Sequence, residues 1–226
     1  MNFLFKPVSE GGVGLSMVRI PVSMMSDFVV QQPYTYVNEG DFNLESFSIE
    51  KDKEFFIPII KEALQINPDL VLLAVPWSAP GWMKETNTLY GSSFKSSFTD
   101  IYALYLRKYL ESYAREGINI QYLVPQNEPL HSANGYPTMS LSANDEAALV
   151  ERLASEISSA NLATKLVIYG HNWDNLDYAR SILLRPGMQD MVYGVAFHCY
   201  AGDYRAPGQL AQEFPDIAIL FEECSG

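Results

Sequence analysis

Short apolar runs alternate with longer amphipathic stretches along the chain. Six of the runs have the length, and the glycine, proline or polar flanks, that are typical of strands. These runs are residues 15–21, 70–76, 122–124, 165–169, 192–197 and 217–221. The run at 70–76 contains no polar residue, which predicts a strand buried on both faces, as in a parallel sheet.

The stretches between these runs have the spacing of amphipathic helices. Helices are expected over residues 55–64, 99–116, 142–160, 176–184 and 210–214. Pro58 is expected to bend the first of them or to confine it to one side, because proline interrupts the helical hydrogen-bond ladder. Strands that alternate with helices predict βαβ units, a parallel sheet and an α/β fold.

Acidic residues lie at the exits of two of the predicted strands. Glu128 follows the strand at 122–124, and Glu222 and Glu223 follow the strand at 217–221. Because α/β barrels place their chemistry at the carboxyl ends of their strands, these acids are expected on one rim. Two strand-end glutamates on one rim would supply the pair of carboxyl groups that a glycoside hydrolase uses. Taken alone, Glu128 could equally be a solvated loop acid that caps the next helix.

Length and composition fit one folded domain. The 226 residues are 48% hydrophobic and 13% aromatic, which argues against a disordered chain. Charged residues make up 19% and the formal net charge is −12, so a neutral ligand is expected and nucleic acid is not. No run reaches the roughly 18 apolar residues of a membrane helix, and the N-terminal residues lack the long apolar region of a signal peptide.

The histidines and cysteines show no metal-site pattern. His131, His171 and His198 stand singly, without the spacing of metal ligands, so neither a metal nor a cofactor is expected. Cys199 and Cys224 each follow a predicted strand. The two could pair, but they are no disulfide framework, and buried free thiols are the favoured interpretation.

Three other side chains have a functional and a plain structural interpretation. Arg19 lies within a predicted buried strand and needs a carboxylate partner, either in the site or elsewhere. Trp77 could offer a flat apolar face to a sugar ring or could pack at the rim. His198 could serve the site or be a hydrogen-bonded core histidine.

A set of short motifs, in order along nearly the whole chain, carries a specific resemblance. They are Arg-Ile-Pro at 19–21, Ser-Asp-Phe at 26–28, Pro-Trp-Ser-Ala-Pro-Gly-Trp-Met-Lys at 76–84, Gln-Asn-Glu-Pro at 126–129, Gly-Tyr-Pro at 135–137, His-Asn-Trp-Asp at 171–174, His-Cys-Tyr-Ala-Gly at 198–202 and Glu-Cys-Ser-Gly at 223–226. With these motifs the chain closely resembles glycoside hydrolase family 30, which includes glucosylceramidases and β-1,6-glucanases.

The resemblance implies an incomplete (β/α)8 TIM barrel. Asn-Glu-Pro would end strand four and Glu223 would end strand seven, so the six predicted strands would be strands two to seven. Residues 1–226 would then form one partial catalytic domain, truncated at both ends, without strand one, strand eight and the family's β-sandwich domain. The full-length parent is expected to be secreted or extracellular, without stable insertion into a membrane.

The resemblance also implies roles for particular residues. Glu128 corresponds to the general acid/base and Glu223 to the nucleophile, while Glu222 stands where the family typically has a small hydroxyl residue. Arg19 would pair with the nucleophile, and Asn127 would bind the sugar 2-hydroxyl. The residues expected to line the subsite of the cleaved sugar are Asp27, Trp77, His198 and Tyr200.

The implied activity is that of a retaining glycosidase that cleaves β-glucosidic bonds, with β-1,6-glucan as the expected substrate. Glucosylceramide, a glycolipid, is the alternative substrate, and a sugar-binding or inactive fragment is the alternative to an enzyme. The two carboxyl groups are expected about 5–5.5 Å apart, and their like charges are expected to raise the pKa of the acid. Glu222 is expected to point the opposite way to Glu223, because successive strand residues face opposite sides.

Overall fold

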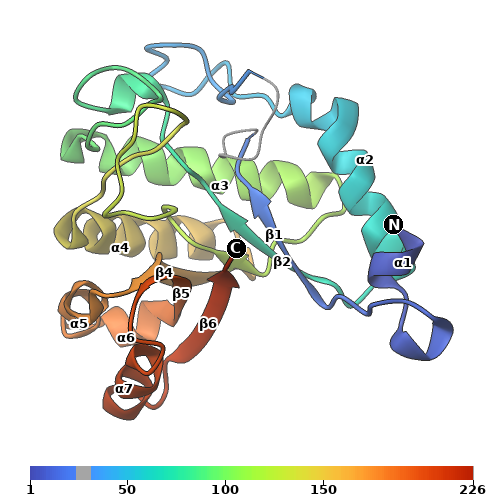
Figure 1. The fold of residues 1–226 in the computed structure, drawn as a ribbon. Helices are drawn as coiled ribbons and strands as arrows, with labels where there is room; N and C mark the ends of the chain where they lie inside the picture. The colour runs from blue at the N-terminus through green and yellow to red at the C-terminus, as the bar shows by residue number, and fades with distance from the viewer. Residues whose placement is uncertain (24–31, 226) are drawn as a thin grey trace.

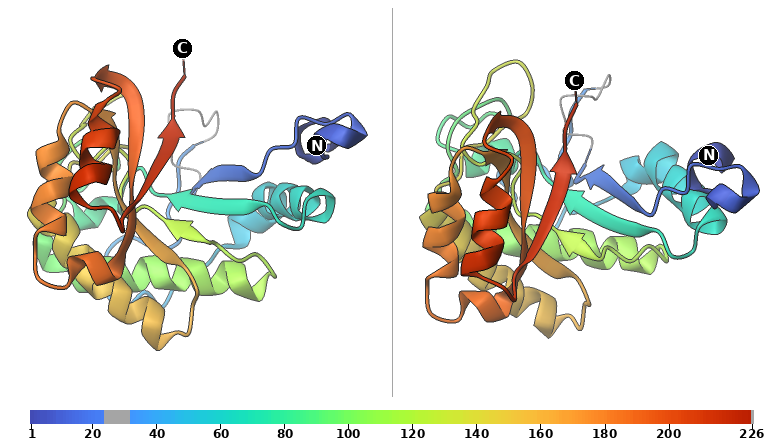
Figure 2. Two further views of the ribbon diagram at one scale, coloured as in Figure 1. Left: turned by 90° about the horizontal axis from the view of Figure 1, so that it is seen from below. Right: turned by 60° about the horizontal axis from the view of Figure 1, so that its bottom comes forward.

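The sheet has six parallel strands in the spatial order β1-β2-β3-β4-β5-β6, which is also their order in the chain. The computed structural model describes residues 1–23 and 32–225. The strands are β1 (Met17–Pro21), β2 (Val71–Val75), β3 (Tyr122–Leu123), β4 (Lys165–Trp173), β5 (Val192–Gly202) and β6 (Ala218–Glu223). The sheet curls into a half-barrel (Figures 1 and 2), which confirms the predicted α/β fold and the incomplete TIM barrel.

Helices connect the strands and cover the convex face of the sheet (Figure 2). They are α1 (Asn2–Phe5), α2 (Glu50–Ile66), α3 (Thr99–Arg115), α4 (Ala143–Ser159), α5 (Leu176–Leu183), α6 (Met188–Met191) and α7 (Ala206–Glu213), with 3-10 turns at Val8–Glu10, Gly81–Met83 and Ser96–Phe98. Over the described parts of the chain, no helix combines the length and the apolar character needed to cross a membrane.

Helix α2 differs most from its prediction. It begins at Glu50, ahead of the predicted start, and it continues through Pro58, so the expectation that proline confines it to one side is wrong. Asp52 in its first turn is fully buried and accepts hydrogen bonds from three tyrosine hydroxyls. The donors are Tyr34, Tyr36 at 2.7 Å and Tyr113 at 2.6 Å. This anchor holds the start of the helix, and an apolar pattern cannot reveal it.

Strands β4 and β5 run past their predicted ends because the ladder continues through polar residues. His171 pairs with Phe197, Asn172 with His198, and Trp173 with Gly202. Both strands therefore carry polar side chains above the end of the buried sheet. The pairing between strands, rather than local hydrophobicity, decides where these two strands end.

A β-bulge lies near the end of β6. Phe221 pairs with Phe197 of β5, and the next paired residue is Glu223, opposite His198. Glu222 is therefore an extra residue on β6, and a bulge of this kind re-aims the side chains beside it. The strict alternation of faces stops at the position where the two glutamates stand.

The concave side of the sheet is filled by a small apolar cluster beneath the rim. Its buried members are Leu73, Val75, Trp77, Val124, Val167 and Ala196. A barrel interior filled by side chains in this way is a packed floor and not a pore. The polar side chains at the carboxyl ends of the strands thus stand on an apolar base.

Cys199 and Cys224 form a disulfide, with their Cα atoms 5.2 Å apart. The expectation of free thiols is therefore wrong. Cys199 lies on β5 and Cys224 directly follows β6, and these two strands are neighbours in the sheet. The spacing of the cysteines along the sequence does not reveal that adjacency, whereas the tertiary structure decides it.

Replacing both cysteines by serine is expected to destabilise the protein. The bond closes a loop with a sequence separation of 25, and the chain-entropy model gives about 3.5 kcal/mol for a loop of that size. Thermal unfolding of the Cys199→Ser/Cys224→Ser protein should show a lower Tm that no longer responds to reductant. Equal Tm values for the oxidised wild type and the double variant would contradict this prediction.

Candidate active site

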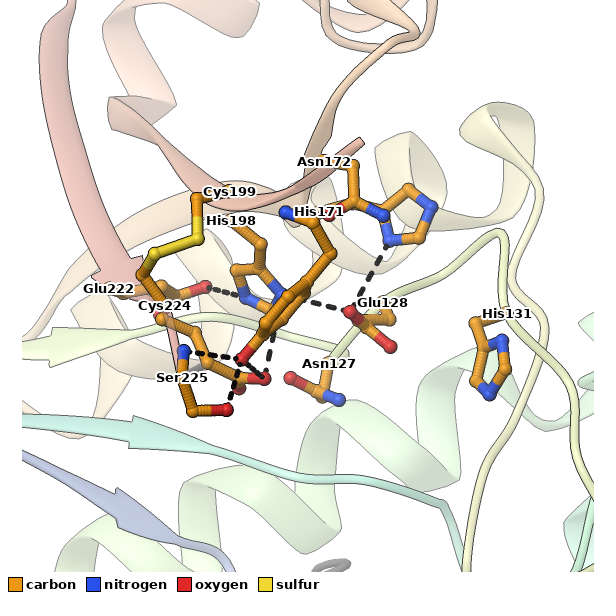
Figure 3. Close-up of polar contacts among 12 residues, drawn as sticks. Asn127, Glu128, His131, His171, Asn172, His198, Cys199, Glu222, Cys224 and Ser225 are labelled. Atoms are coloured by element: carbon orange, nitrogen blue, oxygen red, sulfur yellow. Dashed lines mark hydrogen bonds and ion pairs between the residues drawn. A yellow bond between two sulfur atoms is a disulfide. The ribbon is translucent and has the colours of Figure 1, made fainter. Parts of the chain in front are cut away.

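Polar side chains from several strands meet at the carboxyl ends of the sheet (Figure 3). Asn127 and Glu128 come from the loop after β3, His198 comes from β5, and Glu222 and Glu223 end β6. Arrangement of chemistry on this rim is the rule for α/β barrels. The fold therefore gathers at one place the strand-end glutamates of the sequence pattern, which include Glu128 and Glu223, the pair that the family resemblance implies as catalytic.

Glu128 is held by the backbone of neighbouring strands. Its N–H donates to the carbonyl of Gly170 at 2.9 Å, and the N–H of Asn127 donates to the carbonyl of Pro76 at 2.8 Å. Glu128 has φ of 47°, in the left-handed region that residues other than glycine rarely adopt. Such strain persists only where the surroundings enforce it, and it is concentrated at functional sites.

Arg19 reaches the two glutamates of β6 from β1. Its Nη1 lies 2.6 Å from Glu223 Oε2, and its Nε lies 3.3 Å from Glu222 Oε2. Its Nη2 donates to the side-chain oxygen of Asn127. The guanidinium also lies over the ring of Trp77, 4.6 Å from the ring centroid. One arginine therefore ties β1 and β6 to the loop that carries Glu128.

His198 is fully buried and lies between the carboxylates (Figure 3). Its Nδ1 is 3.0 Å from Glu128 Oε1, and its Nε2 is 3.4 Å from Glu222 Oε1. Glu223 Oε1 is 3.9 Å from Nδ1. Both nitrogens of the ring thus face carboxylate oxygens, which is the environment of an imidazolium.

The positions of Glu222 and Glu223 correct the expectation that these residues face opposite sides. Both contact Arg19, and both carboxylates lie near His198. The reason is the bulge, which leaves Glu222 without a register partner on β5. The side chain of Glu222 is 2% exposed and that of Glu223 is 14% exposed, so Glu223 is the more accessible of the two.

The protonation of the site is set by these contacts. Burial lowers the pKa of His198, but its hydrogen bonds with Glu128 and Glu222 and the charges of Glu222 and Glu223 outweigh burial and raise that pKa. Burial raises the pKa of Glu128, but the hydrogen bond and charge of His198 outweigh it, so that pKa lies below its ordinary value. The prediction that the pKa of the general acid, Glu128, is raised is therefore wrong. That prediction considered the two carboxylates without the histidine between them.

Glu128, Glu223 and His198 also offer a possible donor set for a cation. A ligand atom of each lies within 4.8 Å of the others. However, Arg19 already lies 2.6 Å from Glu223, and its positive charge disfavours a cation on the same carboxylate. The arrangement therefore suits an ion-pair network better than a metal centre.

The remaining predicted site residues lie at different depths. Tyr200 is 43% exposed, and its hydroxyl donates to Glu223 Oε1 at 3.0 Å. Asn127 is buried beside Glu128. Trp77 is only 4% exposed and packs against Arg19, so it offers little surface to a sugar. Asp27 lies outside the described residues.

Sequence reasoning assigned no role to His171, which the structure brings to the site. Its Nδ1 lies 4.0 Å from Glu128 Oε1, and burial lowers its pKa despite the charge of Glu128. The sequence did contain one indication of this role. His171 lies at the exit of the predicted strand 165–169, and Glu128 and His198 also lie at strand exits. A position at a strand exit alone did not say that its side chain would face Glu128.

Comparisons with known proteins agree with this site. Residues 2–226 match a family model described as the glycosyl hydrolase family 30 TIM-barrel domain. An endo-1,6-beta-D-glucanase of Neurospora crassa is 29% identical over 227 residues, which cover 96% of this chain and 47% of that protein. The lysosomal acid glucosylceramidase of Mus musculus is 29% identical over 237 residues, which cover 96% of this chain and 45% of that protein.

A solved structure gives the same result. The endo-beta1,6-glucanase BT3312 matches with a TM-score of 0.89 and 27% identity, over 97% of this chain and 51% of that one. The chain thus spans about half the length of the relatives that it matches. With the half-barrel, the rim of carboxylates and a family model matched over nearly its whole length, the chain belongs to glycosyl hydrolase family 30.

Proposed function

We propose that the chain carries the catalytic centre of a retaining β-glycosidase, with Glu128 as general acid/base and Glu223 as nucleophile. One observation carries the proposal: an oxygen of Glu128 lies within 4.8 Å of an oxygen of Glu223. Carboxyl groups of retaining enzymes stand about 5–5.5 Å apart, whereas an inverting pair needs about 6.5–9.5 Å to admit a water. Residues 1–226 would supply strands two to seven of the catalytic barrel.

Glu223 is suited to attack the anomeric carbon. Arg19 lies 2.6 Å from one of its oxygens, and the Tyr200 hydroxyl donates to the other at 3.0 Å. These contacts come from β1 and β5, so they fix the orientation of the carboxylate at the rim of the sheet. In the first step the Glu223–C1 bond forms while the bond from C1 to the leaving oxygen breaks.

Glu128 would give a proton to that leaving oxygen. His198 Nδ1 lies 3.0 Å from Glu128 Oε1, so one proton can reside either on the histidine or on the glutamate. A bound sugar would displace water from Glu128 and disfavour its charge, which moves the proton toward the carboxyl group. In the second step Glu128 takes a proton from water, water bonds to C1, and the bond to Glu223 breaks.

Further residues around the sugar belong to the proposal. The side-chain oxygen of Asn127 accepts from Arg19, so the NH₂ group of the same amide is left to donate to the sugar 2-hydroxyl. Asp27, Trp77, His198 and Tyr200 would complete the subsite. Trp77 would act mainly by supporting Arg19, because its side chain is buried.

We propose β-1,6-glucan as the substrate. Support comes from the Neurospora crassa relative and from BT3312, both of which are named as 1,6-β-glucanases. Glucosylceramide is the second candidate, supported by the similarity to the mouse glucosylceramidase. Export from the cell is also proposed, because a disulfide between neighbouring strands is typical of proteins in oxidising compartments.

A substrate comparison tests this proposal. The purified protein is expected to release glucose or oligosaccharides from β-1,6-glucan and not from β-1,3-glucan, and NMR should show the β-anomer as the first product. Preference for glucosylceramide would favour the second substrate. Release of the α-anomer, or no hydrolysis of either substrate, would overturn the proposed function.

A further inference from the structure

Glu222 is a buried carboxylate that the two-carboxyl mechanism does not use. Its side chain is 2% exposed, with one oxygen 3.3 Å from Arg19 Nε and the other 3.4 Å from His198 Nε2. Burial raises the pKa of Glu222, but the charge of Arg19 and the contact with His198 outweigh burial and lower it. A carboxylate that is buried this deeply and contacts two residues of the site is expected to have a function there.

The backbone makes a specific space for this carboxylate. The bulge in β6 turns Glu222 toward the site, and Gly170 on β4 leaves room for it. A Cβ atom at position 170 would lie 2.7 Å from Glu222 Oε1, which is too close for any side chain to remain there unchanged. Glu222 therefore occupies the place that a side chain on β4 would fill.

We infer that Glu222 is a positioning residue that fixes the tautomer of His198 and thereby controls the proton shared by His198 and Glu128. This inference rests on the proposed function of Glu128. Glu222 has only acceptors to offer, so a proton on His198 Nε2 points toward it. Nδ1 is then the ring atom that exchanges a proton with Glu128, at 3.0 Å.

The pair of His198 and Glu128 therefore has two states of equal proton count. In one state Nδ1 carries the proton and Glu128 is a carboxylate. In the other state the histidine is neutral and Glu128 is the carboxylic acid that catalysis needs. The Nε2 proton stays on the ring and faces Glu222 in both states, so the ring keeps its orientation while the other proton moves.

Within the described part of the chain, carboxylates, a tyrosine and a second histidine near His198 enter the pH dependence. Glu128 and Glu223 face Nδ1, at 3.0 and 3.9 Å, and Glu222 faces Nε2 at 3.4 Å. The ring of Tyr200 lies edge-on to the imidazole of His198, with 6.0 Å between the two ring centroids. His171 adds an opposing charge only when it is protonated, and burial lowers its pKa.

Removing the charge of Glu222 should change the pKa of His198 in one direction. A nearby negative charge favours a proton on His198, so the Glu222→Gln protein holds the shared proton less tightly. The pH above which the proton is lost then falls, by on the order of one unit for charges this close. The alkaline limb of the kcat/KM profile should move to lower pH by that amount.

The test uses the purified Glu222→Gln protein beside a matched control, Glu151→Gln, which removes an exposed charge on α4. In Glu222→Gln, the alkaline limb of the kcat/KM profile should shift for substrates with poor leaving groups, because these substrates need the general acid. In Glu151→Gln the limb should not shift. A purely packing role would lower kcat/KM equally at every pH and would overturn the inference.

A second readout does not depend on activity. NMR titration of the histidine rings should give a lower pKa for His198 in Glu222→Gln, while His131 serves as the internal reference. Glu222→Asp keeps the charge and should restore most of the wild-type value. An unchanged pKa of His198 in Glu222→Gln would overturn the inference even in an active enzyme. If the wild type hydrolyses no glycoside, the proposed function fails while the titration still decides the role of Glu222.

Discussion

Glu223→Gln is expected to abolish turnover and covalent labelling by a 2-fluoro glycoside. The amide has the shape of the carboxylate but cannot form the glycosyl ester, so the loss in kcat should be at least about 10⁴-fold. The amide oxygen of the introduced glutamine can accept from Arg19, and its NH₂ group can donate to the Tyr200 hydroxyl, so the variant should fold. Mass spectrometry of the labelled protein and kinetics with an aryl β-glucoside are the measurements.

Glu222→Gln provides the matched comparison one residue away. The label should still map to Glu223 in that variant, because Glu222 is 2% exposed and already lies against Arg19 and His198. The Glu151→Gln protein should be labelled like the wild type. A label on Glu222 in the wild-type protein would show that the nucleophile has been assigned to the wrong glutamate.

Glu128→Ala is expected to slow substrates according to their leaving groups. Loss of a general acid costs on the order of 10²–10⁴-fold, and the cost is largest where the leaving oxygen is a poor leaving group. An activated aryl glucoside should form the intermediate at a rate closer to that of the wild type. Azide should then accelerate turnover and give the β-glycosyl azide, since it needs no general base to attack.

The control for this experiment is Glu151→Ala, at an exposed position on α4. Its rates with both kinds of substrate should equal those of the wild type. Equal slowing of good and poor leaving groups by Glu128→Ala, with no effect of azide, would assign the proton donor to another group.

Local sequence patterns were enough to predict the succession of elements and the general place of the chemistry. Each of the six predicted strands is present, and the long helices α3 and α4 begin and end within about a residue of their predicted bounds. These features depend on local periodicity and on flanking residues such as Gly117, which the chain carries without reference to its neighbours. Glu128, Glu222 and Glu223 could be selected because strand exits share one rim, whereas the preference for Glu223 over Glu222 came from the family resemblance.

The tertiary structure decided what depends on which strands lie side by side and in which register. The bulge that turns Glu222 into the site is a property of the β5–β6 pairing, and the disulfide of Cys199 and Cys224 follows from the same adjacency. The proton balance of Glu128 depends on His198, a residue 70 positions away. Such contacts join distant parts of the chain, so neither spacing nor hydrophobic pattern encodes their geometry.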